Sequence, residues 1–321
     1  MAFLTIFTSP KPFTDPHIAI IQRNALANWR ALGEDVAVIV LGDEEGAAEA
    51  AAQTGALHLP GVARNKEGTP LISDLFEQAC QHAAGPLLAY VNADILLLPD
   101  FVETARRVAQ VQRNFLLVGQ RWDLDVTEPL GFAPGWDAAL RERAQGQGRL
   151  HPPAGSDYFI FPKDAFRDMP KFAIGRAGWD NWMIYWARRR GWPTIDATRD
   201  IFIIHQNHDY AHLPGGLPHY RQPETFDNIR LAGGRMVTRF MLADCSHQII
   251  DGKISNRPLT WKKFLREVEI VPLLRLHSRV LGWLGYALFQ PKNAYREARA
   301  WLVKKFNRGR HKTAQFDSKE S

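Results

Sequence analysis

Short apolar runs alternate with longer segments of helical periodicity along the first part of the chain. Phe3 to Phe7 and Val36 to Leu41 are near-continuous apolar runs, as expected of strands in a parallel sheet that is covered on both faces. Between them, Asp15-Pro16 is typical of a helix N-cap followed by proline at the first helical position. Strand and helix alternate roughly five times within about 120 residues. The pattern predicts an α/β chain with a mainly parallel central sheet flanked by helices.

The same periodicity predicts the remaining elements. We expect further strands at 55–60, 86–91 and 115–119, a strand pair at 191–198 and 201–204, and helices at 45–53, 69–83, from Pro99 onward and over 228–251. Residues 119–150 interrupt the rhythm, and Trp122 and Asp123 within them are candidates for lining a ligand site. A surface excursion packed by Trp122 is the alternative.

Polar side chains stand where the predicted strands end. Thr8 and Lys11 follow the first strand, Asp43 follows the second, and Asn92-Ala93-Asp94 follows the strand at 86–91. In open α/β sheets, ligands bind beyond the carboxyl ends of the strands. Asn92 and Asp94 face the same side of an extended chain, where a carboxylate could bind a hard divalent cation. Alternatively, Asp94 only caps a turn and Asn92 only bonds nearby backbone.

Two later segments add candidate side chains. A Gly-Ser-Asp sequence ending at Asp157 precedes an apolar strand, and Asp180 and Asn181 lie in the first turn of a predicted helix beside Trp179. Asp180 could serve as an N-cap and nothing more. A cluster of His205, His208 and His212 follows another apolar run, and such a cluster favours a ligand or proton-transfer role over a purely structural one.

Charge divides the chain into two parts. Residues 261–321 hold 14 Lys/Arg and 5 Asp/Glu, whereas residues 1–260 hold 26 and 29, a net charge of −3 within a total of +6. This asymmetry argues against nucleic-acid binding by the main domain. The basic tail is amphipathic, so it either lies on an anionic membrane surface or packs on the domain with cationic outer faces. We expect domains at 1–259 and 260–307, and a disordered tail at 308–321.

Cysteine usage and the N-terminal residues indicate a compartment. Cys80 and Cys245 are far apart and neither lies in a Cys-x-x-Cys sequence, so we expect a reducing compartment and no thiolate zinc site. The first ten residues lack the features of a signal peptide, and no run of about 18 apolar residues occurs. These features predict a cytoplasmic protein, at the inner face of the membrane if the tail binds lipid.

Taken together, this order of motifs resembles the nucleotide-sugar-dependent glycosyltransferases of the GT-A type, in particular family 2-like members. The resemblance covers roughly residues 1–230 and rests on Asn92-Ala93-Asp94, on the helix start at Asp180 and on His205. It implies a Rossmann-like fold. It also implies an enzyme that transfers a sugar from a UDP- or GDP-sugar to a glycan or lipid-linked acceptor, aided by Mn²⁺ or Mg²⁺. The basic extension would add contact with a membrane, and no nucleic acid is implied.

The resemblance also implies roles for individual residues. Asn92-Ala93-Asp94 matches the family's Asp-x-Asp motif, with Asn in place of the first Asp. The implied metal ligands are Asp94, His205 and His208, and the implied donor-binding residues are Thr8, Lys11, Asp43, Arg64, Asn65 and Asn92. Asp180 would be the catalytic base of an inverting enzyme, or would orient the acceptor in a retaining one. The implied acceptor-binding residues are Trp122, Asp123, Asp157, Trp179 and Asn181.

Three other functions are compatible with parts of the sequence. A sugar-1-phosphate nucleotidyltransferase would need a Gly-rich, Arg-bearing loop after the first strand, and residues 8–13 offer none. A catalytically silent domain that binds glycans or nucleotide sugars would not need Asp94, Asp180 and His205 together. A hydrolase built on the histidine cluster lacks a nearby Glu in a zinc-protease pattern.

Overall fold

The computed structural model describes residues 2–208 and 222–299. The chain divides into two compact units, Met1–Pro258 and Leu259–Ser321, which are described separately. The predicted disordered tail at 308–321 and the candidate His212 lie outside the described residues.

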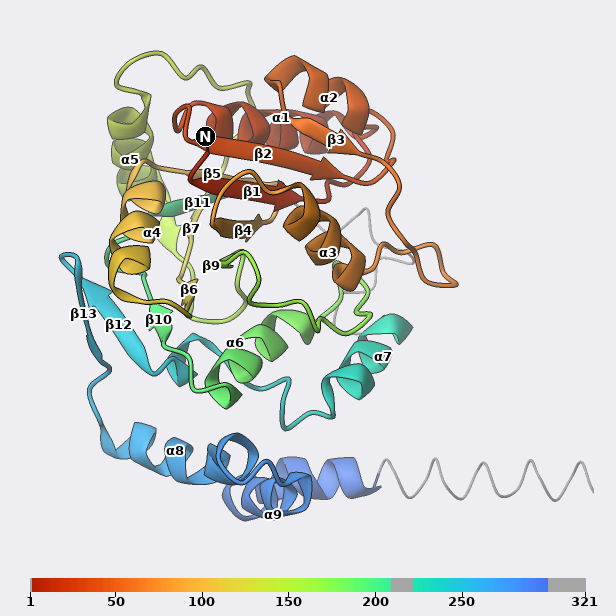
Figure 1. Ribbon diagram of the computed structural model, residues 1–321, viewed down its shortest axis with the longest axis vertical. Helices are drawn as coiled ribbons and strands as arrows, with labels where there is room; N and C mark the ends of the chain where they lie inside the picture. The colour runs from red at the N-terminus through yellow and green to blue at the C-terminus, as the bar shows by residue number, and fades with distance from the viewer. Residues whose placement is uncertain (1, 209–221, 300–321) are drawn as a thin grey trace, which may run out of the picture. The chain divides into compact units, whose positions relative to one another are not determined.

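A nine-stranded sheet forms the centre of the first unit, in the order β13-β12-β10-β6-β9-β4-β1-β2-β3 (Figure 1). Seven of the strands run in one direction, and β9 and β13 run in the other. The predicted α/β fold with a mainly parallel sheet is therefore confirmed. The strands are β1 (Leu4–Thr8), β2 (Val36–Leu41), β3 (Leu57–Leu59), β4 (Leu87–Val91), β6 (Leu116–Val118), β9 (Tyr158–Pro162), β10 (Thr194–Asp196), β12 (His247–Ile250) and β13 (Lys253–Asn256).

Helices cover both faces of this sheet, which explains why its central strands are apolar throughout. On one face, Leu4 and Ile6 belong to an apolar cluster with residues of α1, α2 and α4. On the other, Phe7 packs edge-on against Phe76 of α3 at 5.0 Å. The helices of this unit are α1 (Pro16–Arg30), α2 (Ala47–Thr54), α3 (Ile72–His82), α4 (Asp100–Val111), α5 (Trp136–Gln147), α6 (Trp179–Arg189), α7 (Pro223–Ala232) and a 3₁₀ turn, η3 (Leu242–Asp244).

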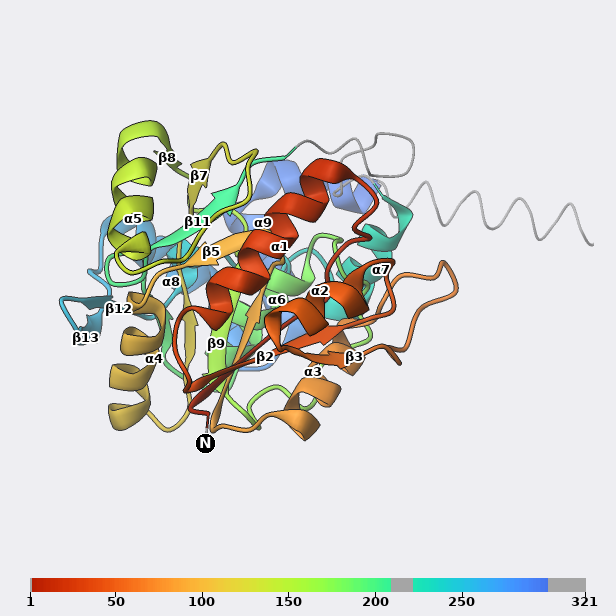
Figure 2. The same ribbon diagram turned by 90° about the horizontal axis from the view of Figure 1, so that it is seen from above.

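A second, four-stranded sheet lies beside α1 and α5 and was not expected from the sequence (Figure 2). Its order is β5 (Ile95–Leu97), β11 (Ile203–Gln206), β7 (Trp122–Leu124) and β8 (Arg149–Leu150). His205 on β11 stands in register with Asp123 on β7 and with Ile95 on β5. This small sheet therefore brings together residues that are far apart in sequence.

Buried polar side chains of α1 hold the edge strand β5. The Asn28 amide donates to the carbonyl of Leu97 over 3.1 Å and accepts from its N–H over 2.7 Å, as a neighbouring strand would. The Trp29 indole donates to the carbonyl of Ile95 over 2.9 Å. These bonds satisfy edge groups that would otherwise be buried without partners. They also fix the start of β5, which directly follows Asp94.

Two predicted elements are wrong. The segment 228–251 is not one helix, because α7 ends at Ala232, Gly233 caps it with φ 104°, and the chain then forms β12. Asp251 and Gly252, with φ of 51° and 74°, make the turn of the β12-β13 hairpin. The segments 191–198 and 201–204 do form strands, but β10 joins the large sheet and β11 the small one, so they are not a pair.

The second unit contains α8 (Trp261–Leu274), α9 (Arg279–Phe289) and a further helical segment over 291–299. The helices α8 and α9 approach closely at Gly282, where a Cβ atom would lie 2.3 Å from a Leu273 methyl carbon. The predicted C-terminal helical extension is therefore confirmed. Among the helices within 2–208 and 222–299, none combines the length and apolar character needed to cross a membrane.

Candidate functional site

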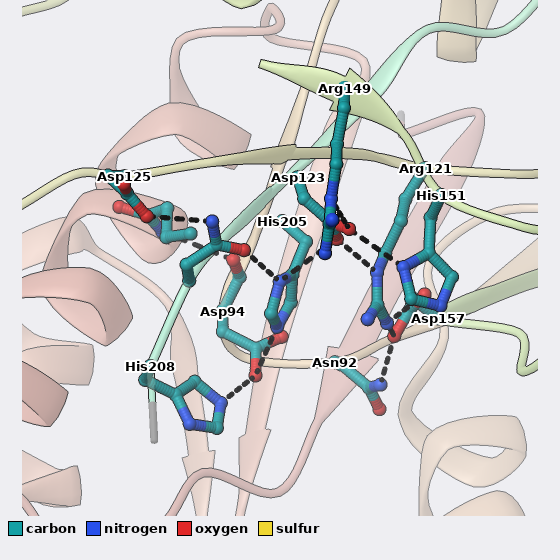
Figure 3. Close-up of polar contacts among 12 residues, drawn as sticks. Asn92, Asp94, Arg121, Asp123, Asp125, Arg149, His151, Asp157, His205 and His208 are labelled. Atoms are coloured by element: carbon teal, nitrogen blue, oxygen red, sulfur yellow. Dashed lines mark hydrogen bonds and ion pairs between the residues drawn. The ribbon is translucent and has the colours of Figure 1, made fainter. Parts of the chain in front are cut away.

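Three potential metal ligands converge where β4 leaves the large sheet. One ligand atom from each of Asp94, His205 and His208 lies within 4.8 Å of the other two. Asp94 Oδ2 lies 3.1 Å from His208 Nε2 and 3.8 Å from His205 Nε2. Figure 3 shows the carboxylate between the two imidazole rings.

The small sheet sets this geometry. The backbone N–H of Gln206, at the end of β11, donates to the carbonyl of Asp94 over 3.1 Å. The buried Gln206 side chain reaches the same carbonyl at 3.3 Å and the carbonyl of Ile21 on α1 at 2.8 Å. Since β11 is tied to Asp94 at this point, His205 and His208 stand on either side of the carboxylate.

The charge state of Asp94 fits a cation site. Burial would raise the pKa of Asp94, but the hydrogen bond with His208 and the charges of His205 and Lys11 outweigh burial and lower it. The carboxylate is therefore ionised at neutral pH. Its other oxygen, Oδ1, is buried and has no hydrogen-bond partner among the described residues. A carboxylate and two imidazoles form a mixed oxygen and nitrogen ligand set.

Lys11 adds positive charge beside this site. Its Nζ lies 3.3 Å from Nε2 of His208, the same nitrogen that approaches Asp94. Gln22 on α1 fixes the Lys11 backbone, accepting from its N–H over 2.6 Å and donating to its carbonyl over 2.9 Å. The ammonium group and the candidate metal ligands therefore share one edge of the sheet, as expected for a site that receives an anion.

The second ring nitrogen of His205 faces acceptor oxygens. Its Nδ1 lies 3.3 Å from Asn207 Oδ1 and 3.6 Å from Asp123 Oδ1. An acceptor on this side favours hydrogen on Nδ1, so that Nε2, on the side of Asp94, is the nitrogen that could bind a cation. Asn207 and Asp123 therefore orient a candidate metal ligand.

Asp123 joins this ligand to a buried ionic network (Figure 3). Its carboxylate accepts from Arg121 Nε over 2.9 Å and lies 2.7 Å from His151 Nδ1, and only 5% of its side chain is exposed. Burial opposes ionisation, but these two partners lower the pKa of Asp123. The sequence suggested Asp123 as an acceptor-binding residue, and the structure places its carboxylate in a buried position among Arg121, His151 and His205.

Asp157 and Asn92 form the other end of the network. Arg121 Nη1 donates to both Asp157 oxygens over 2.8 Å, and the Asn92 amide donates to Oδ1 over 3.0 Å. The Tyr90 hydroxyl donates to Asn92 Oδ1 over 2.9 Å. Both polar atoms of the Asn92 side chain are thus used within the protein. Asn92 stands two residues before Asp94, and its side-chain hydrogen bonds tie it to Tyr90 and Asp157.

Asp180 occupies a different environment. It lies in the first turn of α6, where its carboxylate accepts from the backbone N–H of Gly178 over 3.2 Å. Burial, together with the negative charge of Asp157, raises the pKa of Asp180, and nearby backbone N–H groups offset only part of this. A carboxylate with a raised pKa is a better proton acceptor near neutral pH.

The other predicted acceptor-binding residues lie close to this edge but have internal partners. Trp179 is buried, and its ring packs edge-on against Tyr90 at 4.9 Å. The Asn181 amide donates to the carbonyl of Phe240 over 2.7 Å. Trp122 stacks on Phe202 at 5.2 Å and remains partly exposed, so it keeps surface that a ligand could contact.

The predicted donor-binding residues stand at the same edge, Thr8 as the last residue of β1 and the others after β2 and β3. Thr8 is fully buried, and its hydroxyl has no partner within the described part of the chain. Arg64 pairs with Asp43 and lies 2.8 Å from Glu44. The Asn65 amide donates to Glu224 over 2.6 Å, and its side-chain oxygen accepts from backbone N–H groups of its own turn.

Sequence reasoning missed four residues of this site: Gln22, Arg121, His151 and Asn207. Arg121 lies three residues after the strand β6 and directly before β7, and this position between two strand ends was the signal that could have found it. His151 and Gln22 carry no such signal, because they reach the site from a loop and from a helix.

Sequence comparisons do not identify the chain: no protein-family model matches it, and no curated protein does. Among solved structures, it is similar to glucosyl-3-phosphoglycerate synthase of M. tuberculosis, at 14% identity over 73% of this chain and 81% of that one, with a TM-score of 0.43. A mannosyltransferase from Pyrobaculum calidifontis in complex with GDP-Man and Mn²⁺ matches at 13% identity over 65% and 58%, with a TM-score of 0.38. TarS from S. aureus matches at 12% identity over 40% and 38%, with a TM-score of 0.30. At these identities and TM-scores, the matches say nothing of this chain's substrate or of the roles of its residues.

Proposed function

We propose that this chain is a glycosyltransferase that moves a sugar from a nucleoside-diphosphate donor to an acceptor hydroxyl. The observation that carries the proposal is the convergence of Asp94, His205 and His208, with Lys11 beside His208, at the ligand-binding edge of an α/β sheet. A divalent cation next to an ammonium group matches the two adjacent anionic phosphates of such a donor.

The ligand set favours Mn²⁺ over Mg²⁺. Mg²⁺ prefers oxygen ligands and keeps several waters, whereas two imidazoles and one carboxylate suit a softer cation such as Mn²⁺. Asp94, His205 and His208 would hold the ion, which when bound would stabilise the negative charge on the departing diphosphate. Lys11 would add to the same stabilisation through its own charge.

Transfer requires a proton acceptor. The bond between the sugar's anomeric carbon and the diphosphate oxygen breaks, a bond to the acceptor oxygen forms, and the acceptor's proton passes to a base. We assign this role to Asp180, whose carboxylate has a raised pKa. Asp157 is a weaker candidate, because Arg121 holds both of its oxygens.

The remaining binding residues are proposed from their position. Asp43, Arg64 and Asn65 follow strands of the edge that carries Lys11, where a nucleoside could contact them, whereas Thr8 is fully buried at the end of β1 and would support that edge. Trp122 is the proposed contact for a glycan or lipid-linked acceptor, because its ring is partly exposed. Four further residues would support the site through their contacts within the protein and would not contact substrate: Asn92, Asp123, Trp179 and Asn181.

Calorimetry with Mn²⁺ alone, and then with UDP and GDP in the presence and absence of Mn²⁺, tests the proposal. We expect Mn²⁺-dependent binding of one nucleotide, and at least a tenfold loss of Mn²⁺ affinity in Asp94→Asn. The matched control is Asp168→Asn, whose carboxylate is exposed and pairs only with Arg190 among the described residues. If neither nucleotide binds with Mn²⁺ present, or if Asp94→Asn behaves like the control, the proposal is wrong.

Turnover separates an enzyme from a silent binding domain. The nucleotide sugar that carries the bound nucleotide should release nucleoside diphosphate when an acceptor is present. If the chain binds the nucleotide sugar but releases no nucleoside diphosphate with any glycan or lipid-linked acceptor, it is a domain that only binds nucleotide sugars.

A further inference from the structure

The helical unit that begins at Leu259 carries most of the exposed large apolar side chains of the described chain. Twelve of the eighteen such side chains lie between Leu259 and Tyr295, although this segment is a small part of the described residues. Single exposed apolar residues are ordinary on protein surfaces, but a concentration of them indicates a binding surface.

On α8 these side chains form one stripe. Trp261, Phe264, Val268 and Val271 follow at intervals of three and four residues, which places them on one side of the helix. The Trp261 and Phe264 rings stack at 5.5 Å, and Trp261 is 73% exposed. The buried residues of α8 that meet α9, such as Leu273, lie on the opposite side. The stripe is therefore separate from the apolar face that α8 already uses.

A similar stripe runs along α9. Val280, Leu284 and Leu288 follow at intervals of four residues and are 73%, 53% and 76% exposed. The two helices thus present apolar side chains outward while packing on each other through Leu273 and Gly282.

Positive charge accompanies these stripes. Residues 259–299 hold eight Lys/Arg and three Asp/Glu, a net charge of +5. Each acidic residue has a partner within the unit: Glu267 with Lys263, Glu269 with Arg266, and Glu297 with the Tyr286 hydroxyl. Among the described residues 259–299, the excess of positive charge is therefore not compensated.

We infer that this helical unit docks on an anionic lipid bilayer, with the α8 and α9 stripes at the headgroup level. Amphipathic helices with aromatic residues on one side and cations beside them bind such surfaces without crossing them. The charge complementarity selects an anionic lipid surface over a neutral one. The inference does not depend on the function proposed for the first unit.

Sedimentation of the full chain with vesicles tests the inference. We expect binding to vesicles of phosphatidylcholine mixed with phosphatidylglycerol, weakened by added salt, and no binding to phosphatidylcholine alone. The double variant Trp261→Ser, Phe264→Ser should bind about tenfold more weakly. Replacing both Lys262 and Arg275 with Gln should weaken binding about fivefold for each charge removed. The control is Phe226→Ser, Leu231→Ser, which removes two exposed apolar side chains from α7.

Circular dichroism of each variant, compared with the unaltered chain, shows that the helices remain formed. Binding that persists in the Trp261, Phe264 variant, or that falls equally in the α7 control, would overturn the inference. Failure of the unaltered chain to bind anionic vesicles would also overturn it. A dimer that sediments without vesicles, and that the Trp261, Phe264 variant loses, would assign the surface to a second copy of the chain instead.

Discussion

The side-chain amide of Asn92 donates a hydrogen bond to Oδ1 of Asp157 over 3.0 Å. The backbone N–H of Asn92 donates to the carbonyl of Asp157 over 2.9 Å, so the two residues are joined twice. The Tyr90 hydroxyl occupies the amide oxygen of Asn92. A carboxylate at position 92 could accept from Tyr90 but could not donate to Asp157. This relationship explains why the chain has Asn rather than Asp two residues before Asp94.

The variant Asn92→Asp should be destabilised. It would place two carboxylates in contact in a mostly buried site, which raises the pKa of the pair above that in the unfolded chain. A group whose pKa is higher in the folded chain than in the unfolded chain stabilises the folded state only in its protonated form. The deficit should therefore be largest at neutral pH, about 1–3 kcal/mol, and should shrink as the pH falls through the pKa of the pair.

Urea unfolding at neutral pH and at about pH 4.5 measures this effect. The matched control is Asn114→Asp on the exposed loop after α4, where we expect a change within about 0.5 kcal/mol. Equal stability of Asn92→Asp and the unaltered chain at neutral pH would contradict the structural role of Asn92.

Arg121 is the cation that allows Asp123 and Asp157 to be buried close together. The variant Arg121→Met keeps much of the side-chain volume but leaves two carboxylates without their main partner. We expect a loss of about 3–5 kcal/mol in the free energy of unfolding, as for other buried ion pairs that lose one member. The pair of Arg190 and Asp168 is largely exposed, so Arg190→Met should cost no more than about 1 kcal/mol. Comparable losses in the two variants would show that the Arg121 network is not buried in solution.

Much of the large sheet follows from local sequence. The strands β1, β2 and β4 are apolar throughout, and α1 begins at an Asp-Pro pair, so their positions could be predicted within a few residues. The rule that ligands bind beyond strand ends singled out Asp94, and the histidine cluster after an apolar run singled out His205. The structure brings these two residues together. Sequence patterning succeeds here because each signal is local.

The small sheet could not be predicted in the same way. Its strands are two to four residues long, and β5 pairs with β11, which lies about a hundred positions later in the chain. No local pattern encodes such a pairing. The role of Asn92 depends on Asp157, which directly precedes the distant strand β9, and was missed for the same reason. By contrast, the hairpin after α7 had a local signal, because Asp251-Gly252 is a typical turn pair. The prediction missed this signal because the periodicity of 228–251 was interpreted as one helix.

Asp180 should show opposite effects on activity and stability. Because burial raises its pKa in the folded chain, its ionised form opposes folding at neutral pH. The favourable contribution of its protonated form is present below the unfolded pKa and is lost as the pH rises through the folded pKa. Asp180→Asn should therefore be at least as stable as the unaltered chain at neutral pH. Because Asp180 is the proposed base, Asp180→Asn should also lower turnover by about 10²–10⁴-fold.

Thermal unfolding and the rate of nucleoside-diphosphate release, both at neutral pH, check these expectations. Asp164→Asn, which alters an exposed carboxylate, is the control for both measurements. Full turnover in Asp180→Asn at saturating substrate would remove the assignment of Asp180 as the base, whatever its stability.

Lys11 should affect the anion and not the metal. Its ammonium group lies 3.3 Å from His208 Nε2, but an ammonium group is not a metal ligand. In Lys11→Met we expect the affinity for UDP or GDP with Mn²⁺ present to fall about tenfold, because a charge-assisted contact contributes about 1.5–3 kcal/mol. The affinity for Mn²⁺ alone should stay the same or rise, since a nearby positive charge is removed. Calorimetry with Mn²⁺, and then with the nucleotide, separates the two effects.

Lys66→Met is the control, because Lys66 is exposed and pairs only with Glu67 among the described residues. If Lys11→Met weakens Mn²⁺ binding while the affinity of the Mn²⁺-loaded protein for the nucleotide is unchanged, Lys11 acts by positioning His208 and does not contact the diphosphate.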